Sequence, residues 1–219
     1  MDNLRLRFAK TGRAIYISHL DLMRTMQRSF LRAGLSLKYS EGFNPHAQLT
    51  FALPMSLGIA SHCELMDFKA GSFMSLAEIS YRLNKSFPEG LVAYEAYEAE
   101  TKFKNIRWLD VNGCFEYDTL SASDLIPQLM DFFARDSLVI QKRTKSGMND
   151  ADIAPAIRSI SFDTSSKGVS FKAIVSAQEP TLNPEHLVTA LRQLAPELVP
   201  NFATFERAQL YDSNMNIFR

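Results

Sequence analysis

Near its start the chain reads Leu4-Arg5-Leu6-Arg7-Phe8, and ten residues after Phe8 begins the run Ser18-His19-Leu20-Asp21. The first segment alternates apolar and charged side chains, which is the pattern of a β-strand with one apolar face. In the second, Ser18 precedes Asp21 by three positions, an arrangement typical of the first turn of a helix. Apolar residues then recur at helical spacing as far as Gly34, where the helix should end. The chain therefore begins with a strand followed by a helix.

The alternation of strands and helices continues along the whole sequence. Helices are expected to begin after Ser75, near Ser123 and after Asn183. Further strand-like segments are 48–51, 64–68, 91–94, 108–117, 138–141, 169–175 and 202–210. The order strand–helix–strand–strand–helix–strand thus occurs twice, which predicts an α+β protein of two tandem ferredoxin-like (βαββαβ) halves with antiparallel sheets. We expect the halves at 1–104 and 105–219, with 143–163 as a basic, mobile insertion in the second half.

Composition excludes several classes of protein. The chain has 219 residues, 46% of them hydrophobic and 22% charged, which fits a folded protein of one large or two small domains. No apolar run approaches the roughly 20 residues of a membrane span, and the first residues do not resemble a signal peptide. The only cysteines are Cys63 and Cys114. We therefore expect a cytoplasmic protein without a disulfide framework.

Positive charge is concentrated at the start of the chain. Residues 1–50 carry eight Lys or Arg against three Asp or Glu, although the whole chain has a formal net charge of +0. Arg24, Arg28 and Arg32 are spaced four residues apart and should line one face of the first helix. Such a stripe suggests an anionic partner, and nucleic-acid phosphate is the commonest. The alternative is a solvated helix face neutralised by nearby acids. Further candidates for phosphate contacts are Arg13, Lys142, Arg143 and Lys145.

Residues from three segments rich in polar side chains are candidates for one pocket. They are Ser18, His19, Asp21, Gly42, Phe43, Asn44, His46 and Glu64. An anion could bind at the amides of the helix start, with Gly42 permitting a tight loop beside it. A metal or acid–base site built from His19, Asp21, His46 and Glu64 is the sharper alternative, because histidine and carboxylate side chains supply such sites. A rigid structural loop is the third interpretation, and no metal ligand is assigned.

Common cofactor motifs do not occur in the sequence. It has no Walker lysine loop, no Rossmann glycine fingerprint and no GxSxG elbow. Two cysteines are too few for an iron–sulfur cluster, which takes about four ligands. We expect no cofactor in this chain.

Several of these segments together resemble a known bacterial family. They are Phe8-Ala9-Lys10-Thr11-Gly12, Ile17-Ser18-His19-Leu20-Asp21, Tyr39-Ser40-Glu41-Gly42-Phe43-Asn44-Pro45-His46, Leu57-Gly58 and Glu64. In this order they are similar to the radical SAM-linked domain, a domain of unknown function fused to or encoded beside cobalamin-binding-type radical SAM proteins. The runs 142–147 and 152–155 also resemble this family. Ala47 stands where the family usually has a second proline.

The resemblance implies a partner and a role. The partner would be a radical SAM enzyme supplied in trans, and this chain would be an accessory module rather than the catalyst. The genes near members of the family implicate RNA, so the expected function is recognition of tRNA or rRNA for that enzyme. Two alternatives remain: a small hydrolase or RNA-cleaving enzyme that uses His19 or His46, and a protein–protein adaptor whose arginines dock an acidic surface. CRISPR RNA endonucleases share tandem ferredoxin-like halves, a similarity of fold only.

Overall fold

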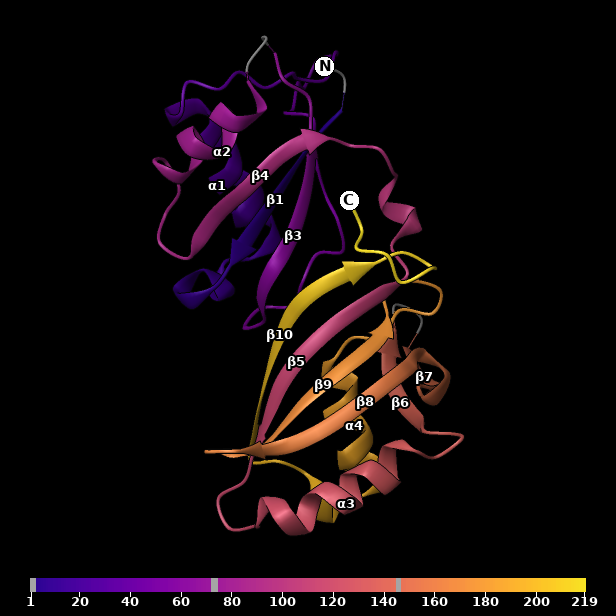
Figure 1. The fold of residues 1–219 in the computed structure, drawn as a ribbon. Helices are drawn as coiled ribbons and strands as arrows, with labels where there is room; N and C mark the ends of the chain where they lie inside the picture. Colours follow the sequence, from indigo (N-terminus) through magenta and orange to yellow (C-terminus); the bar gives the residue numbers. More distant parts are fainter. Residues whose placement is uncertain (1–2, 72–74, 145–146) are drawn as a thin grey trace. The chain divides into compact units, whose positions relative to one another are not determined.

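The structure is a computed structural model that describes residues 3–71, 75–144 and 147–219. The chain divides into two compact units, an N-terminal unit of Met1–Phe103 with Arg219 and a C-terminal unit of Lys104–Phe218 (Figure 1). Both contain helices and antiparallel strands, so the protein has a mixed α+β structure. None of the described helices is both long enough and apolar enough to cross a membrane.

The N-terminal unit is built around one antiparallel sheet. In chain order its elements are β1 (Leu4–Lys10), the 3-10 turn η1 (Gly12–Tyr16), α1 (His19–Arg32), β2 (Leu49–Phe51), β3 (Ala60–Phe68), α2 (Leu76–Asn84) and β4 (Leu91–Glu98). The strands lie in the order β4-β1-β3, and β2 pairs with β3. The N-cap of α1 is Ser18, whose Oγ accepts from the Asp21 amide at 3.1 Å. Both the first strand and the start of the first helix are thus confirmed.

The core of this unit lies between the sheet and its two helices. The apolar side chains of β1 are fully buried there with residues of α1 and α2, namely Leu4, Leu6, Phe8, Met26, Phe30, Ile79 and Leu83. The rings of Phe30 and Phe68 meet edge to face, with their centroids 5.0 Å apart. Because alternate residues of a strand face opposite sides, the arginines of β1 point to the side of the sheet without helices.

That second side of β1 is buried as well. The side chain of Arg5 is 0% exposed, and its guanidinium donates to the Asp67 carboxylate of β3 at 2.6 and 2.9 Å. It also donates to the Thr101 carbonyl at 2.7 Å, and its central carbon lies 4.3 Å from the ring centroid of Phe103. The segment that follows β4 therefore covers this part of the sheet. The alternating sequence of β1 predicts only that the polar side chains lie on this side, and not that they are covered.

The C-terminal unit has a four-stranded sheet and a separate hairpin. Its elements are β5 (Trp108–Glu116), α3 (Ala122–Phe133), β6 (Val139–Thr144), β7 (Gly147–Asp152), the 3-10 turn η3 (Ala154–Ala156), β8 (Ile157–Ser165), β9 (Gly168–Ser176), α4 (Glu185–Leu194), the 3-10 turn η4 (Pro196–Leu198) and β10 (Phe202–Tyr211). A further 3-10 turn, η2 (Phe103–Asn105), precedes them. The strands of the sheet lie in the order β10-β5-β9-β8, while β6 and β7 form a separate two-stranded sheet. Phe133 of α3 stacks on Phe162 of β8, with centroids 5.9 Å apart, so α3 covers this sheet.

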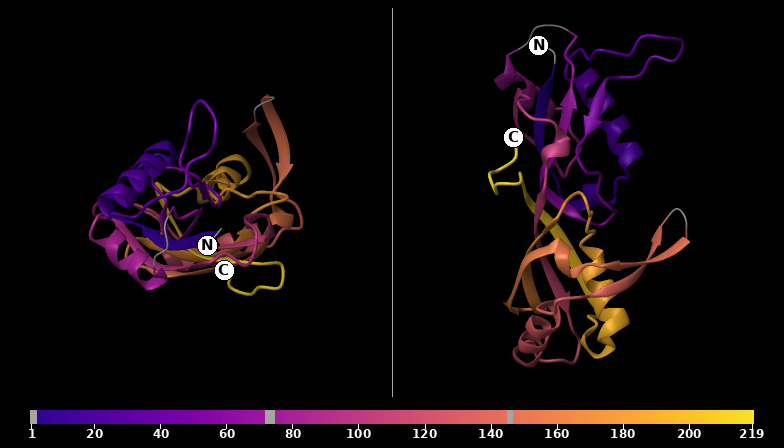
Figure 2. Two further views of the ribbon diagram at one scale, coloured as in Figure 1. Left: turned by 90° about the horizontal axis from the view of Figure 1, so that it is seen from above. Right: turned by 90° about the vertical axis from the view of Figure 1, so that its right-hand side faces the viewer.

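The predicted insertion at 143–163 is wrong in its extent. Its second part belongs to β8, which pairs with β9 along its whole length. Conversely, 138–141, expected as a strand of the sheet, enters the β6–β7 hairpin, which projects from the unit (Figure 2). The reason lies in burial: Ile157, Ile160 and Phe162 are only half-buried among serines and threonines, so β8 has a weak hydrophobic pattern. Ile140, in contrast, is fully buried although its strand lies outside the sheet.

Candidate functional site

The segment between α1 and β2 forms a loop whose base is held by Ser40 and His46 (Figure 2). The Ser40 amide donates to the His46 carbonyl at 2.8 Å, and the His46 amide donates to Ser40 Oγ at 3.1 Å. The same Oγ lies 2.8 Å from His46 Nδ1. Tyr39 and Ala47 pair as antiparallel neighbours just outside this contact. At Gly42 φ is +118°, a conformation that favours glycine, so the chain turns there without strain.

The tip of this loop presents an aromatic ring to solvent. Phe43 is fully exposed and Tyr39 is 56% exposed. A phenylalanine left in water forgoes about 1.5–3 kcal/mol of burial free energy, so such a ring on a tethered loop favours a contact with a partner. Bases of single-stranded RNA stack on exposed rings of this kind. Phe43 is therefore the residue of the loop best placed to bind another molecule.

At the start of α1, Ser18 and Asp21 stabilise the helix itself. The Ser18 hydroxyl donates to the Asp21 carboxylate at 2.7 Å, and Arg24 donates to the same carboxylate at 3.2 Å. The hydrogen bond from Ser18, then that from Arg24, lowers the pKa of Asp21 below its ordinary value. Asp21 is thus held ionised as part of the helix cap, which makes it a poor general acid.

His19 and Glu64 line one small cavity together with Lys10. The His19 ring packs edge to face on Phe51, with centroids 5.4 Å apart, and Glu64 is buried. The cavity has a volume of about 10 Å³, which is space for one water at most. The fold therefore brings His19 and Glu64 to the same cavity, but this cavity is too small for a substrate or a hydrated ion.

The arginine stripe on α1 is largely satisfied within the unit. Arg24 pairs with Asp21, and Arg32 donates to the Ser86 carbonyl at 2.7 Å and to Ser29 Oγ at 3.1 Å. Arg28 is exposed and makes neither a hydrogen bond nor an ion pair with any residue that the structure describes. Only Arg28 of the three is thus uncommitted and able to bind an external anion without breaking an internal contact.

The other predicted cationic contacts are distributed over both units. Arg13 lies exposed on η1 in the N-terminal unit. Lys142 and Arg143 lie on β6 in the C-terminal unit, the first half-buried and the second exposed. Lys145 lies outside the described residues.

Lys142 also influences a half-buried histidine on α4. Burial, and then the charge of Lys142, lowers the pKa of His186 below its ordinary value, and its Nδ1 is buried without a hydrogen-bond partner in the described chain. Protonation of His186 is therefore less favourable in the folded than in the unfolded state.

The free energy of unfolding should fall as the pH drops below about 6.5, where an unfolded histidine takes up a proton. A His186→Gln variant should show a shallower loss between pH 7 and 5 in urea unfolding, and an unchanged slope would contradict this.

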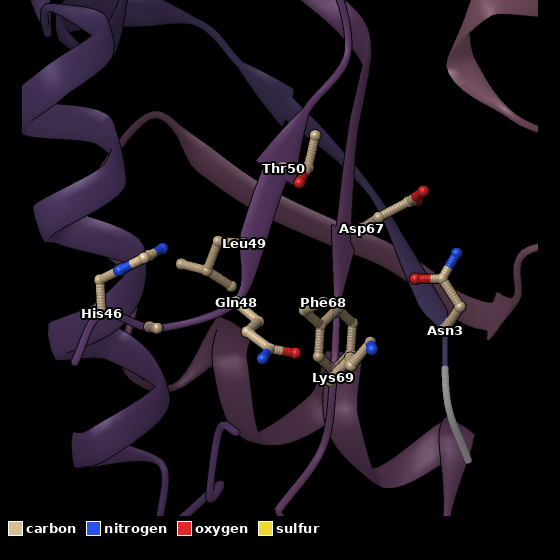
Figure 3. A pocket seen from close by; sticks show the side chains of 9 residues that line it. Asn3, His46, Gln48, Leu49, Thr50, Asp67, Phe68 and Lys69 are labelled. Atoms are coloured by element: carbon tan, nitrogen blue, oxygen red, sulfur yellow. The ribbon is translucent and has the colours of Figure 1, made fainter. Parts of the chain in front are cut away.

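A larger cavity of about 280 Å³ lies elsewhere in the N-terminal unit (Figure 3). Its lining comes from three parts of the chain: Asn3, residues 46–50 leading into β2, and residues 67–69 at the end of β3 and just after it. Figure 3 shows His46 on one side and Asp67 with Asn3 on the opposite side. Of these, the sequence singles out only His46 for a pocket. Gln48 lies two residues after the loop motif. Asn3 and Lys69 carry no sequence signal, because the pairing of Leu4 with Phe68 is what brings these flanking residues together.

The structure separates the four residues grouped for a metal or acid–base site. His19 and Glu64 line the small cavity, His46 lines the larger one, and Asp21 lines neither. Within the described ranges, no three His, Cys, Asp or Glu side chains are arranged to hold a metal ion.

Comparisons with other proteins identify a family but no activity. No curated protein matches the chain. A crystal structure of an unknown protein from Galdieria sulphuraria is similar over 96% of this chain and 98% of that one, with 10% identity and a TM-score of 0.27. A family model described as "Uncharacterized protein conserved in bacteria (DUF2344)" matches residues 3–184. Since this match spans most of the sequence, the chain belongs to that uncharacterised bacterial family.

Proposed function

We propose that this chain is an accessory module that recognises RNA, as tRNA or rRNA, and docks it for a radical SAM enzyme supplied as a separate protein. We also propose that each unit is a ferredoxin-like module. Numbered along each unit, the sheet strands lie in the order 4-1-3-2: β4-β1-β3-β2 in the first, β10-β5-β9-β8 in the second. The shared order supports the second proposal.

The observation that carries the RNA proposal is the loop that presents Phe43. Its base is tied by the hydrogen bonds between Ser40 and His46, which lowers the conformational entropy lost when its tip binds. Its tip is an aromatic ring with both faces open to solvent, as base stacking requires. Uncommitted cations in the same unit, Arg13 and Arg28, would supply the electrostatic attraction to phosphate.

The radical SAM partner is proposed on the resemblance of the loop and helix motifs to the radical SAM-linked domain. Cys63 is buried and Cys114 is half-buried. Two such thiols do not suit a cluster that takes about four ligands. The cluster and the radical chemistry would therefore belong to the partner, and this chain would present the substrate.

The test compares Phe43→Ala with Phe202→Ala, an exposed aromatic in the other unit. Binding of unfractionated bacterial tRNA and of fragmented rRNA is measured by fluorescence anisotropy. Loss of one stacked base costs about 1–3 kcal/mol, so Phe43→Ala should weaken binding roughly fivefold or more while Phe202→Ala has little effect. Equal affinities for all three proteins, or no RNA binding by the wild type, would rule out the proposed recognition surface.

Arg28→Ala should weaken RNA binding and lower the slope of log K against log salt by about 0.7–0.9, the equivalent of one phosphate contact. Arg24→Ala is the matched comparison, because Arg24 stands one turn away and is already paired with Asp21. It should change the slope less. Titrations between 50 and 200 mM salt measure both values. Identical slopes for Arg28→Ala and the wild type would remove α1 from the interface.

The partner is tested by co-purification with a radical SAM protein of the kind that the resemblance implies, with and without ribonuclease. Recovery that depends on RNA supports a shared substrate. Recovery that survives ribonuclease and is lost in Phe43→Ala, with RNA affinity unchanged, would instead indicate a protein–protein adaptor.

A further inference from the structure

The 280 Å³ cavity of the N-terminal unit has a lining suited to one class of ligand. It lies just below the usual range for small-molecule sites, about 300–1,000 Å³, so it suits a ligand the size of one nucleotide or smaller. Ala47, Leu49 and Phe68 supply an apolar wall, and polar side chains supply the remainder.

The carboxylate in this lining is already neutralised. Asp67 receives Arg5 Nε on one oxygen at 2.6 Å and Arg5 Nη2 on the other at 2.9 Å. Thr50 pairs with Asp67 across β2 and β3, so Arg5, Asp67 and Thr50 form one row across three strands. Because a carboxylate in a bidentate pair repels an incoming anion only weakly, Asp67 does not bar a negatively charged ligand.

The cavity is also lined by a lysine, Lys69. Lys69 is half-buried, and its ammonium has neither an ion pair nor a hydrogen bond within the described part of the chain. A lysine that borders a cavity without a counter-charge attracts anions, and partial burial strengthens the attraction relative to water. With Arg5 and Asp67 balanced, Lys69 gives the cavity an excess of positive charge.

Other side chains of the lining can donate hydrogen bonds. Asn3 and Gln48 contribute amide groups and Thr50 a hydroxyl, while His46 contributes an imidazole from the base of the loop (Figure 3). Among the described residues, the Gln48 side-chain amide makes one long hydrogen bond, at 3.4 Å to the Tyr39 carbonyl. Donors from several directions match the tetrahedral oxygens of a phosphate better than a planar carboxylate.

We propose that this cavity binds a phosphate monoester, with Lys69 as its counter-charge and Asn3, Gln48 and Thr50 as its donors. The phosphate could be the end of an RNA strand or part of a free nucleotide. The first source rests on the proposed RNA recognition, and would place a strand end beside the loop that carries Phe43; the second does not depend on it.

The experiment measures binding by isothermal titration calorimetry with four probes: uridine, uridine monophosphate, and a six-nucleotide RNA with or without a terminal phosphate. Wild type is compared with Lys69→Gln, and with Lys104→Gln as an exposed lysine of the other unit. We expect uridine monophosphate to bind at least about tenfold more tightly than uridine, and Lys69→Gln alone to remove that difference. Thr50→Val, which keeps the side-chain shape, should remove part of it.

The outcomes separate the two proposals. A Lys69-dependent preference for the phosphorylated RNA supports the cavity and identifies a strand end as the source. A preference seen only with the mononucleotide supports the cavity and identifies a free nucleotide as the source. RNA recognition fails separately, if neither of the two RNAs binds. Equal binding of uridine and its monophosphate, or a preference unchanged in both Lys69→Gln and Thr50→Val, overturns the phosphate site.

Discussion

An Arg5→Ala variant should have a free energy of unfolding about 3–5 kcal/mol below that of the wild type. Arg5 is 0% exposed and pairs with Asp67, which is itself only 14% exposed. Alanine removes both hydrogen bonds to Asp67, the hydrogen bond to Thr101 and the contact with Phe103, and leaves a largely buried carboxylate without its counter-charge. Urea unfolding followed by circular dichroism measures the loss.

Two further variants identify the cause of this loss. Arg82→Ala breaks an ion pair between side chains that are each 43% exposed, and should cost no more than about 0.5 kcal/mol. The double variant Arg5→Met/Asp67→Leu buries no charge and should be clearly more stable than Arg5→Ala. If the double variant is as unstable as the single one, the loss comes from packing and not from the isolated carboxylate.

Gly90→Ala should destabilise the N-terminal unit severely, because two costs coincide. At φ +89° a residue with a Cβ is strained by about 1–3 kcal/mol. That Cβ would also lie 2.3 Å from the Thr11 carbonyl oxygen and 2.8 Å from Ala14 Cβ, and relief of such overpacking costs about 1–3 kcal/mol more. The Gly90 carbonyl accepts from the Thr11 amide at 2.8 Å, so any displacement also disturbs η1.

Comparison with Gly58→Ala separates the two costs. Gly58 has nearly the same φ, +84°, but nothing lies within 4 Å of an added Cβ. It should therefore show the backbone strain alone, and the difference between the two variants in thermal or urea unfolding measures the close approach of Thr11 and Ala14. Equal losses at both positions would mean that η1 moves aside at little cost.

The secondary structure that depends on neighbours in the sequence was predictable. The alternation in 4–8 predicted β1, and Ser18 correctly marked the start of α1, since both signals act over a few residues. The sequence did not predict β8. The apolar residues of this strand are only half-buried beside β9, so its sequence shows little hydrophobic periodicity.

The candidate site was predictable to a smaller extent. The motif at 40–46 does form a distinct loop, and the spacing of Arg24 from Asp21 allowed a local ion pair. The partner of Arg32 is the Ser86 carbonyl, 54 positions away in the chain, and nothing near Arg32 indicates it. Arg28 could therefore be distinguished from its two neighbours only in the folded chain.

Periodicity, caps and turn residues in the sequence alone determined that this protein alternates strands and helices, and that an aromatic and polar loop follows its first helix. Only the tertiary structure decided which charged side chains pair within the protein. Arg5 is buried against Asp67 of a different strand, while Lys69 lies at the edge of a cavity. The reason is physical. Helical and strand patterns arise from interactions over a few residues, whereas the partner of a charge depends on strand register and chain reversal, which bring together residues far apart in the sequence.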